Sequence, residues 1–131
     1  MKRTELREHI FRMIFRVEFH TQEEYEEKLN FYIEGLAEPT EDEMTYLLEK
    51  SQKVIDKIPE LDAQLNDKIT GWKTDRMGRV ELSIARLALY EILFDDDIPS
   101  GVAINEAVEL AKRYGSTDAP SFINGVLAKY V

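Results

Sequence analysis

The segment from Gly78 to Phe94 constrains the fold most, because its apolar residues surround a helix instead of lining one side of it. Only Arg86 and Glu91 interrupt the apolar surface in its second half. The apolar positions are Leu82, Ile84, Ala85, Leu87, Ala88 and Leu93. A helix that is apolar nearly all round is stable only when other elements cover it. The segment therefore predicts a deeply buried helix in a larger packed structure.

The N-terminal part of the chain predicts three further helices. Thr4 is placed to cap the first, which runs to about Phe19. The second and third open at the pairs Thr21 with Glu24 and Thr40 with Glu43. Each pair has the T-x-x-E pattern of a capping box, in which two side chains satisfy backbone N–H groups at a helix start.

Proline and glycine residues mark the remaining boundaries. The second helix is expected to stop before Pro39 and the third before Pro59, which suits the first position of a fourth. That fourth helix is expected to end near Gly71, with Trp72 folding back as an apolar plug.

The C-terminal part predicts a sixth helix from Ser100 or Gly101 to a C-cap at Gly115, and a seventh that opens at Pro120. With six glycines and four prolines in 131 residues, the chain has few turn residues for a many-stranded sheet, and no alternating run predicts a strand. We therefore expect one all-α domain of about seven helices over residues 1–131.

The net charge of −9 argues at first against a nucleic-acid partner, since a negative field repels phosphate. The distribution changes this interpretation. Residues 1–16 carry a local charge of +3 and residues 17–67 a local charge of −11. Charges are screened over about 8 Å at physiological salt, so a basic patch can act locally on an acidic molecule. The alternative is that these charges form ordinary solvated faces.

The first helix is apolar on two faces. Phe11, Phe15 and Phe19 recur at intervals of four and lie opposite the main apolar stripe. Such a helix is either sandwiched inside the protein, joining two small bundles, or offers one face to a partner. We expect the sandwich.

Lys2, Arg3 and Arg7 place positive charge at a helix start, where the helix dipole favours acids. Guanidinium groups and helix N-termini both bind phosphate, so the arrangement is consistent with an RNA-binding segment. A solubilising N-terminus explains the same residues equally well.

A second unusual region lies near the C-terminus, where Asp118 ends a polar turn before Phe122, and Asn124 and Gly125 interrupt an apolar helix. An Asn side chain can bond a base edge and a Phe ring can stack on an unpaired base. Capping and core packing account for these residues more simply.

No pattern in the sequence indicates an enzyme, a cofactor or a metal site. The chain has no Cys, no Gly-rich phosphate loop and no metal-binding histidine motif. His9 is expected to be a plain surface histidine with Glu5 one turn back as an available local partner, and His20 lies eleven residues further on. The absence of a long apolar run or signal peptide predicts a cytoplasmic protein.

Several segments together resemble the signature of the NusB family of transcription antitermination factors. The resemblance spans the chain and is strongest in its C-terminal half. It rests on Val102–Lys112 (VAINEAVELAK), Tyr114-Gly115, Phe122–Leu127 (FINGVL), Arg86–Glu91 (RLALYE), Ile98-Pro99, Arg7-Glu8 and the single Trp72.

The resemblance implies a fold of two small helical bundles and a function in binding instead of catalysis. Members of this family pair with the small ribosomal subunit protein NusE and bind single-stranded boxA RNA of ribosomal RNA leader transcripts. The complex joins RNA polymerase and other Nus factors. Members differ in self-association, so a homodimer of the free protein is left open, as is a helical interaction module that binds no RNA.

Carried over by position, the resemblance implies RNA contacts and a protein-partner surface. The implied RNA-binding residues are Lys2, Arg3, Arg7, Asp118, Phe122 and Asn124, and the implied partner contacts are Phe15 and Glu81. Two departures from the family pattern stand out. Glu5 interrupts the basic cluster, and Phe15 replaces a frequent Tyr.

Overall fold

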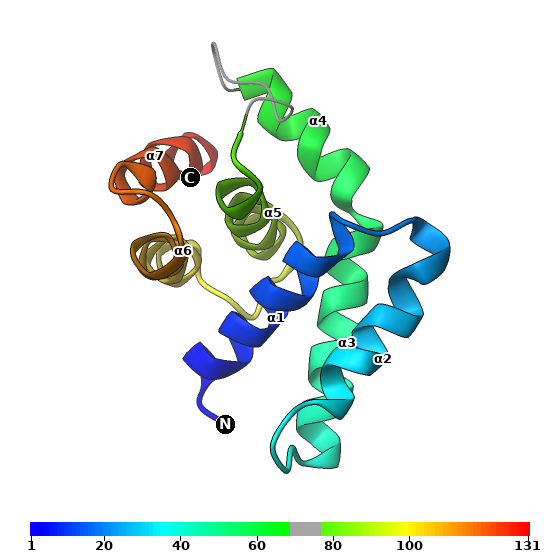
Figure 1. The fold of residues 1–131 in the computed structure, drawn as a ribbon. Coiled ribbons are helices and arrows are strands. Elements are labelled where there is room, and N and C mark those ends of the chain that lie inside the picture. The colour runs from blue at the N-terminus through cyan, green and yellow to red at the C-terminus, as the bar shows by residue number, and fades with distance from the viewer. Residues whose placement is uncertain (69–76) are drawn as a thin grey trace. The chain divides into compact units, whose positions relative to one another are not determined.

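The computed structural model of the chain describes residues 1–68 and 77–131, which form seven α-helices and two short 3-10 helices (Figure 1). The predicted all-α fold is confirmed. The chain divides into two compact units, Met1–Asp56 and Lys57–Val131, and each is described by itself. The predicted end of the fourth helix at Gly71 and the role of Trp72 lie outside the described residues.

The first unit contains α1 (Arg3–Val17), the 3-10 helix η1 (Gln22–Glu24), α2 (Tyr25–Glu34) and α3 (Glu41–Asp56). Helix α1 packs against both α2 and α3. Apolar side chains at helical spacing on all three helices form the core. They are Ile10, Met13, Ile14, Val17, Leu29, Ile33, Leu47, Val54 and Ile55.

Both predicted capping boxes are present. The Glu43 N–H donates to Thr40 Oγ1 at 3.1 Å, and the Thr40 N–H donates to Glu43 Oε1 at 2.8 Å. The Thr21–Glu24 box opens η1, which leads into α2. The prediction for Thr4 was wrong. The N-cap residue of α1 is Lys2, so Thr4 lies inside the first turn, and α1 ends at Val17.

The three phenylalanines form the predicted row, with Phe11 and Phe15 in α1 and Phe19 two residues past its end. The ring centroids of Phe11 and Phe15 lie 6.2 Å apart, and those of Phe15 and Phe19 lie 5.2 Å apart in an edge-to-face contact. Exposure increases along the row, from 3% at Phe11 to 54% at Phe19. Phe11 is therefore buried and Phe19 is exposed, so the second apolar face is not covered along its whole length.

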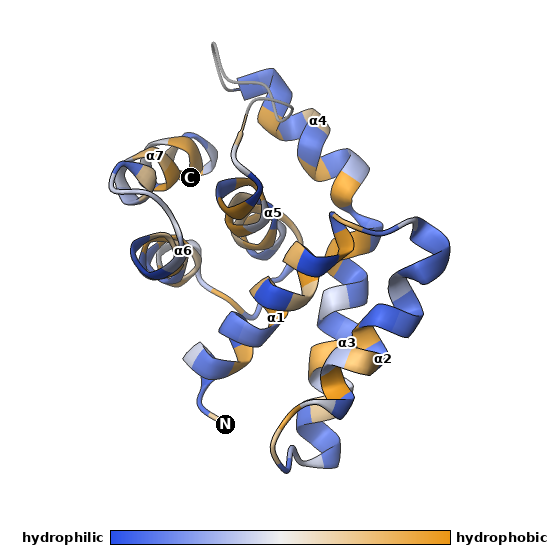
Figure 2. Cartoon of the chain, in the orientation of Figure 1, coloured by the Kyte–Doolittle hydropathy of each residue, from blue (hydrophilic) through white to orange (hydrophobic). Residues whose placement is uncertain are grey.

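The second unit contains α4 (Ile58–Lys68), α5 (Arg79–Phe94), α6 (Ser100–Tyr114), α7 (Ala119–Leu127) and the 3-10 helix η3 (Ala128–Tyr130). Helix α5 is central to this unit, since α4, α6 and α7 all contact it. Every residue from Leu82 to Glu91 is buried, which confirms the prediction of deep burial. Hydrophobic residues are concentrated on α5 and α7 (Figure 2).

The glycine and proline signals of this unit are close to the observed boundaries. Gly78 is the N-cap residue of α5 and Gly115 is the C-cap residue of α6, as predicted. Pro59 and Pro120 each occupy the second helical position instead of the first. Both prolines still lie in the first turn, where the missing N–H costs no helical hydrogen bond.

A buried ion pair joins α4 to α5. Arg86 donates from Nε to Asp62 Oδ1 at 2.8 Å and from Nη2 to Asp62 Oδ2 at 2.7 Å. Burial raises the pKa of Asp62 to about 6 and lowers the pKa of Arg86 to about 10. These shifts reflect the cost of removing both charges from water, which the two charge-assisted hydrogen bonds offset.

We predict that Asp62→Ala lowers the free energy of unfolding by about 2–3 kcal/mol, because it leaves the buried Arg86 guanidinium without its carboxylate. The double variant Asp62→Leu/Arg86→Met should lie within about 1 kcal/mol of the wild type, since it removes both charges together. Urea titrations followed by circular dichroism measure both values. Equal stability of Asp62→Ala and the wild type would contradict this role of the pair.

Candidate RNA and protein-partner site

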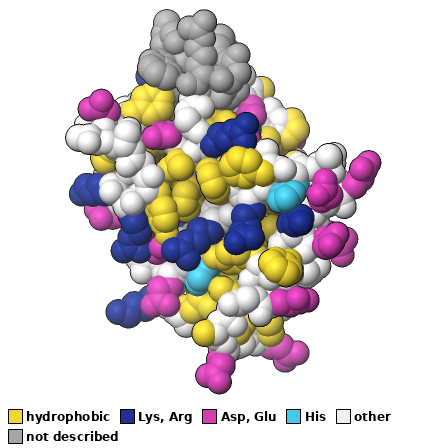
Figure 3. Space-filling view, viewed as in Figure 1, with side chains coloured by type: hydrophobic (Ala, Val, Ile, Leu, Met, Phe, Trp, Pro, Cys, Tyr) yellow, Lys and Arg dark blue, Asp and Glu magenta, His cyan; other side chains and the backbone are white. Residues whose placement is uncertain are grey.

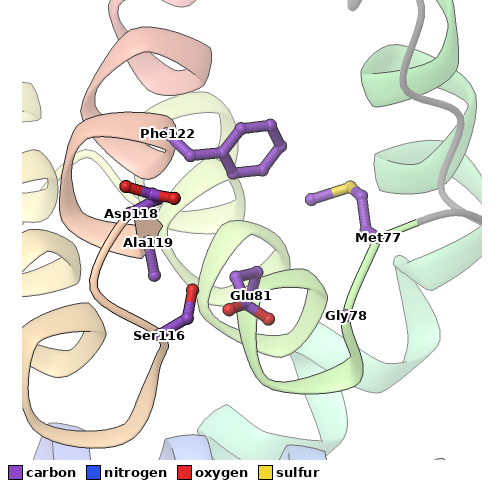
Figure 4. Close-up of a pocket in the computed structure, with 7 residues that line it drawn as sticks. All are labelled: Met77, Gly78, Glu81, Ser116, Asp118, Ala119 and Phe122. Atoms are coloured by element: carbon purple, nitrogen blue, oxygen red, sulfur yellow. The ribbon is translucent and has the colours of Figure 1, made fainter.

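Glu81, Asp118 and Phe122 line one pocket of about 330 Å³ in the second unit (Figure 4). Met77, Gly78, Ser116 and Ala119 complete its lining. The pocket brings together three residues for which the sequence predicted two different ligands. Asp118 and Phe122 were expected to contact RNA, and Glu81 was expected to contact a protein partner.

Two helix starts and one turn position the lining side chains. Glu81 lies in the first turn of α5, three residues after the N-cap Gly78. Asp118 is the N-cap residue of α7, and Phe122 follows one turn into that helix. In Figure 4 the side chains of Phe122 and Met77 point toward one another, while Glu81 projects from α5 toward the turn that carries Ser116.

Two glycines make room for the Glu81 carboxylate and for the tight turn between α6 and α7. A Cβ atom added at Gly78 would lie 2.3 Å from Glu81 Oε2. A Cβ atom added at Gly115 would lie 2.6 Å from the Ala119 Cβ, 2.9 Å from the Ala111 carbonyl oxygen and 3.4 Å from Glu81 Oε1. The glycines therefore leave the space that the Glu81 carboxylate occupies.

The chemistry of the pocket favours hydrogen-bond donors. Glu81 and Asp118 supply carboxylates, which accept hydrogen bonds and repel phosphate. Phe122 supplies a half-buried ring that can stack on a planar group. Ligand groups that fit are the amino edge of a nucleobase or a cationic side chain of a protein.

The other predicted RNA contacts do not line this pocket. Asn124 is exposed on α7, and Lys2 and Arg3 are exposed at the start of α1 in the first unit. Arg7 is only 8% exposed, so it lacks the accessible surface of Lys2 and Arg3. Phe15, the second predicted partner contact, is half-buried in the aromatic row of α1.

The predicted partner of His9 was wrong. His9 Nδ1 lies 2.7 Å from the Tyr32 hydroxyl, so its contact is with α2 instead of Glu5 in its own helix. Sequence reasoning also missed Met77 and Ser116. Neither residue shows a helical pattern or a functional motif, and only the fold brings them beside Glu81.

Within residues 1–68 and 77–131, no three Asp, Glu, His or Cys side chains gather in a way that could hold a metal ion. None of the helices described is long and apolar enough to cross a membrane.

Together the fold and the site define an all-helical protein with an acidic, aromatic pocket and exposed cations on its first helix. The sequence model of the NusB family matches residues 4–131. The chain belongs to the NusB family.

Alignments with similar proteins of this family extend over nearly the whole chain. The transcription antitermination protein NusB of Agathobacter rectalis is 52% identical over 130 residues, which is 99% of each chain. The solved structure of T. maritima NusB superposes with a TM-score of 0.88 at 30% identity, covering 99% of this chain and 90% of that one.

A structure of antitermination factors NusB and NusE in complex with double-stranded RNA contains a chain of the same fold. Its TM-score is 0.85 at 24% identity, and the match covers 98% of this chain and 94% of the other. At this identity the comparison shows the fold.

We predict that Gly115→Ala lowers the free energy of unfolding by about 1–3 kcal/mol, because its Cβ would press on Ala119 and on the Ala111 carbonyl oxygen. Gly101→Ala is the matched control. An added Cβ there has nothing within 4 Å and lies in helix α6, so it should stabilise by roughly 0.5–1 kcal/mol. Thermal and urea unfolding measure the difference, and equal effects of the two substitutions would argue against a tight turn at Gly115.

Proposed function

We propose that this protein is a transcription antitermination factor that acts as a heterodimer with the small ribosomal subunit protein NusE. The heterodimer binds single-stranded boxA RNA of ribosomal RNA leader transcripts and joins the RNA polymerase complex with other Nus factors. The observation that carries the proposal is the match to a NusB transcription antitermination protein at 52% identity over 99% of both chains.

The pocket of the second unit supports a role in recognising bases. A base stacked on Phe122 would bring its amino groups toward acceptors, and the carboxylates of Asp118 and Glu81 are the acceptors present. Phosphate is disfavoured there because both carboxylates are negative. Phosphate contacts are therefore assigned to exposed cations such as Lys2 and Arg3.

The charge distribution supports a basic protein partner. The acidic excess between residues 17 and 67 attracts a basic ribosomal protein and repels RNA. Glu81 provides a carboxylate near the start of α5, and Phe15 provides an apolar contact on α1. RNA binding then depends on the partner, which contributes positive charge that this chain lacks.

We predict that NusE raises the affinity of this protein for a labelled single-stranded boxA RNA, because the partner supplies cations and excludes water at the interface. Fluorescence anisotropy with and without NusE measures this gain. Log affinity should fall as log salt rises, as phosphate contacts require. Reversing the charge at Lys2 and Arg3 should weaken RNA binding and leave NusE binding intact.

Lys53→Glu serves as the control for the charge reversal, since Lys53 is an exposed cation on α3. If NusE gives no gain in RNA affinity at any salt concentration, the proposal is wrong. Binding of NusE without any binding of RNA would favour the alternative of a protein-interaction module.

We predict that Glu81→Lys weakens NusE binding by more than about tenfold, because a positive charge replaces a carboxylate facing a basic partner. Glu109→Lys is the matched control, with the same charge change at an exposed position of α6. Isothermal titration calorimetry measures the affinity, and far-ultraviolet circular dichroism reports the fold. A loss of helical signal in Glu81→Lys would assign Glu81 a folding role instead.

A further inference from the structure

The cations of α1 lie on two different sides of the helix. At 100° per residue, His9, Arg12 and Arg16 fall within an arc of about 60°. Arg7 lies about 160° away on the other side and is buried, whereas Arg12 and Arg16 are exposed. Figure 3 shows Lys, Arg and His side chains over the region where Figure 1 places α1.

Tyr32 on α2 contacts all three residues of this arc, His9, Arg12 and Arg16, which we call the basic stripe. Its hydroxyl lies 2.7 Å from His9 Nδ1, and the Arg12 side chain hydrogen-bonds to the same hydroxyl. The Arg16 guanidinium carbon lies 5.1 Å from the centre of the Tyr32 ring, within the range of a cation–π contact. One half-buried tyrosine therefore contacts three basic side chains of the neighbouring helix.

The titration of His9 fits this arrangement. Burial is the main cause that lowers the pKa of His9, and the positive charge of Arg12 lowers it further, so the imidazole is neutral at pH 7. A guanidinium only donates hydrogen bonds. The Tyr32 hydroxyl accepts from Arg12 and shares a second hydrogen bond with His9 Nδ1, whose direction the imidazole tautomer sets.

Arg12 and Arg16 are one helical turn apart, with a rise of about 6 Å between them. Arg12 also forms an exposed ion pair with Glu8 at 3.2 Å, and such pairs contribute little, so a phosphate can compete for the guanidinium. Arg16 lies against the Tyr32 ring with its guanidinium at the exposed surface. Stacking restricts an arginine without using its N–H groups, which leaves them for an anion.

We propose that Arg12 and Arg16, positioned by Tyr32, form a phosphate-binding site for the backbone of single-stranded RNA on the α1–α2 face of the first unit. The inference rests on the proposed RNA-binding function and adds residues that neither the sequence motifs nor the pocket around Phe122 include. With Lys2 and Arg3 at its start, α1 then carries cations along about 20 Å of helix, enough for contacts with successive phosphates.

RNA fits this site better than an acidic protein segment does. A guanidinium has N–H edges that bind phosphate bidentately and a flat face on which a base can stack. Single-stranded RNA supplies both groups along one chain, whereas a carboxylate peptide supplies only the anion. The Tyr32 ring, 5.1 Å from the Arg16 guanidinium carbon, holds this side chain at the α1–α2 face where both contacts can form.

The test is RNA binding by the full chain in complex with NusE, using a fluorescein-labelled single-stranded boxA RNA and a scrambled RNA of equal length. For Arg12→Gln/Arg16→Gln we expect about tenfold weaker binding of both RNAs, since phosphate contacts are independent of sequence. The slope of log affinity against log salt should decrease in magnitude by about 1.4, or about 0.7 for each lost phosphate contact.

Two further variants separate charge from geometry. Arg12→Lys/Arg16→Lys keeps both positive charges but removes the planar guanidinium groups that donate two parallel hydrogen bonds. This variant should therefore keep the slope of log affinity against log salt and bind RNA a few-fold more weakly. Lys53→Gln removes one exposed positive charge elsewhere in the first unit and should match the wild type. Circular dichroism checks that each variant is folded.

An Arg12→Gln/Arg16→Gln protein that binds RNA like the Lys53→Gln control would overturn this inference and leave the proposed function standing. Weaker binding of NusE instead of RNA would also overturn it, because the stripe would then be a protein contact. A wild-type complex that binds no RNA at any salt concentration would overturn both proposals.

Discussion

The complete burial of α5 between Leu82 and Glu91 is the constraint on which the second unit depends. A helix without an exposed face needs neighbours on all sides, and α4, α6 and α7 provide them. The Arg86–Asp62 pair fixes the position of α4 against α5 through two directional hydrogen bonds. Apolar contacts are not directional, so they alone would define this position less closely. Because α5 is held in this way, its first turn presents Glu81 at a defined place beside Asp118 and Phe122.

Local signals in the sequence predicted most of the helices. The Thr40–Glu43 box, Gly78 and Gly115 mark ends correctly because capping involves residues only a few positions apart. Thr4 failed because Lys2 already serves as the N-cap, so α1 starts one residue before Thr4. The pattern of local residues therefore defines the start of a helix only to within one or two positions.

Contacts between distant residues could not be predicted from spacing. His9 was expected to pair with Glu5 one turn away, yet it meets Tyr32, which lies 23 positions further along the chain. Arg86 and Asp62 are 24 positions apart, and the sequence showed only that Arg86 interrupts an apolar helix. The pocket similarly combines Glu81 with Phe122 through the packing of α5 and α7. The family resemblance supplied these site residues, and the fold shows that they are neighbours.

The acidic residues of the chain and the cations Arg12 and Arg16 act on RNA in opposite directions. Repulsion by the acidic excess of residues 17–67 is screened over about 8 Å at physiological salt, so it acts on RNA that comes close to these residues. The attraction of Arg12 and Arg16 is screened over the same distance, and at contact their guanidinium groups add directional hydrogen bonds to phosphate. Under the proposed function, an RNA strand that cannot also contact NusE and the pocket around Phe122 gains too few contacts to offset the repulsion. High net negative charge therefore favours selective binding over general affinity, which is consistent with the proposed antitermination function.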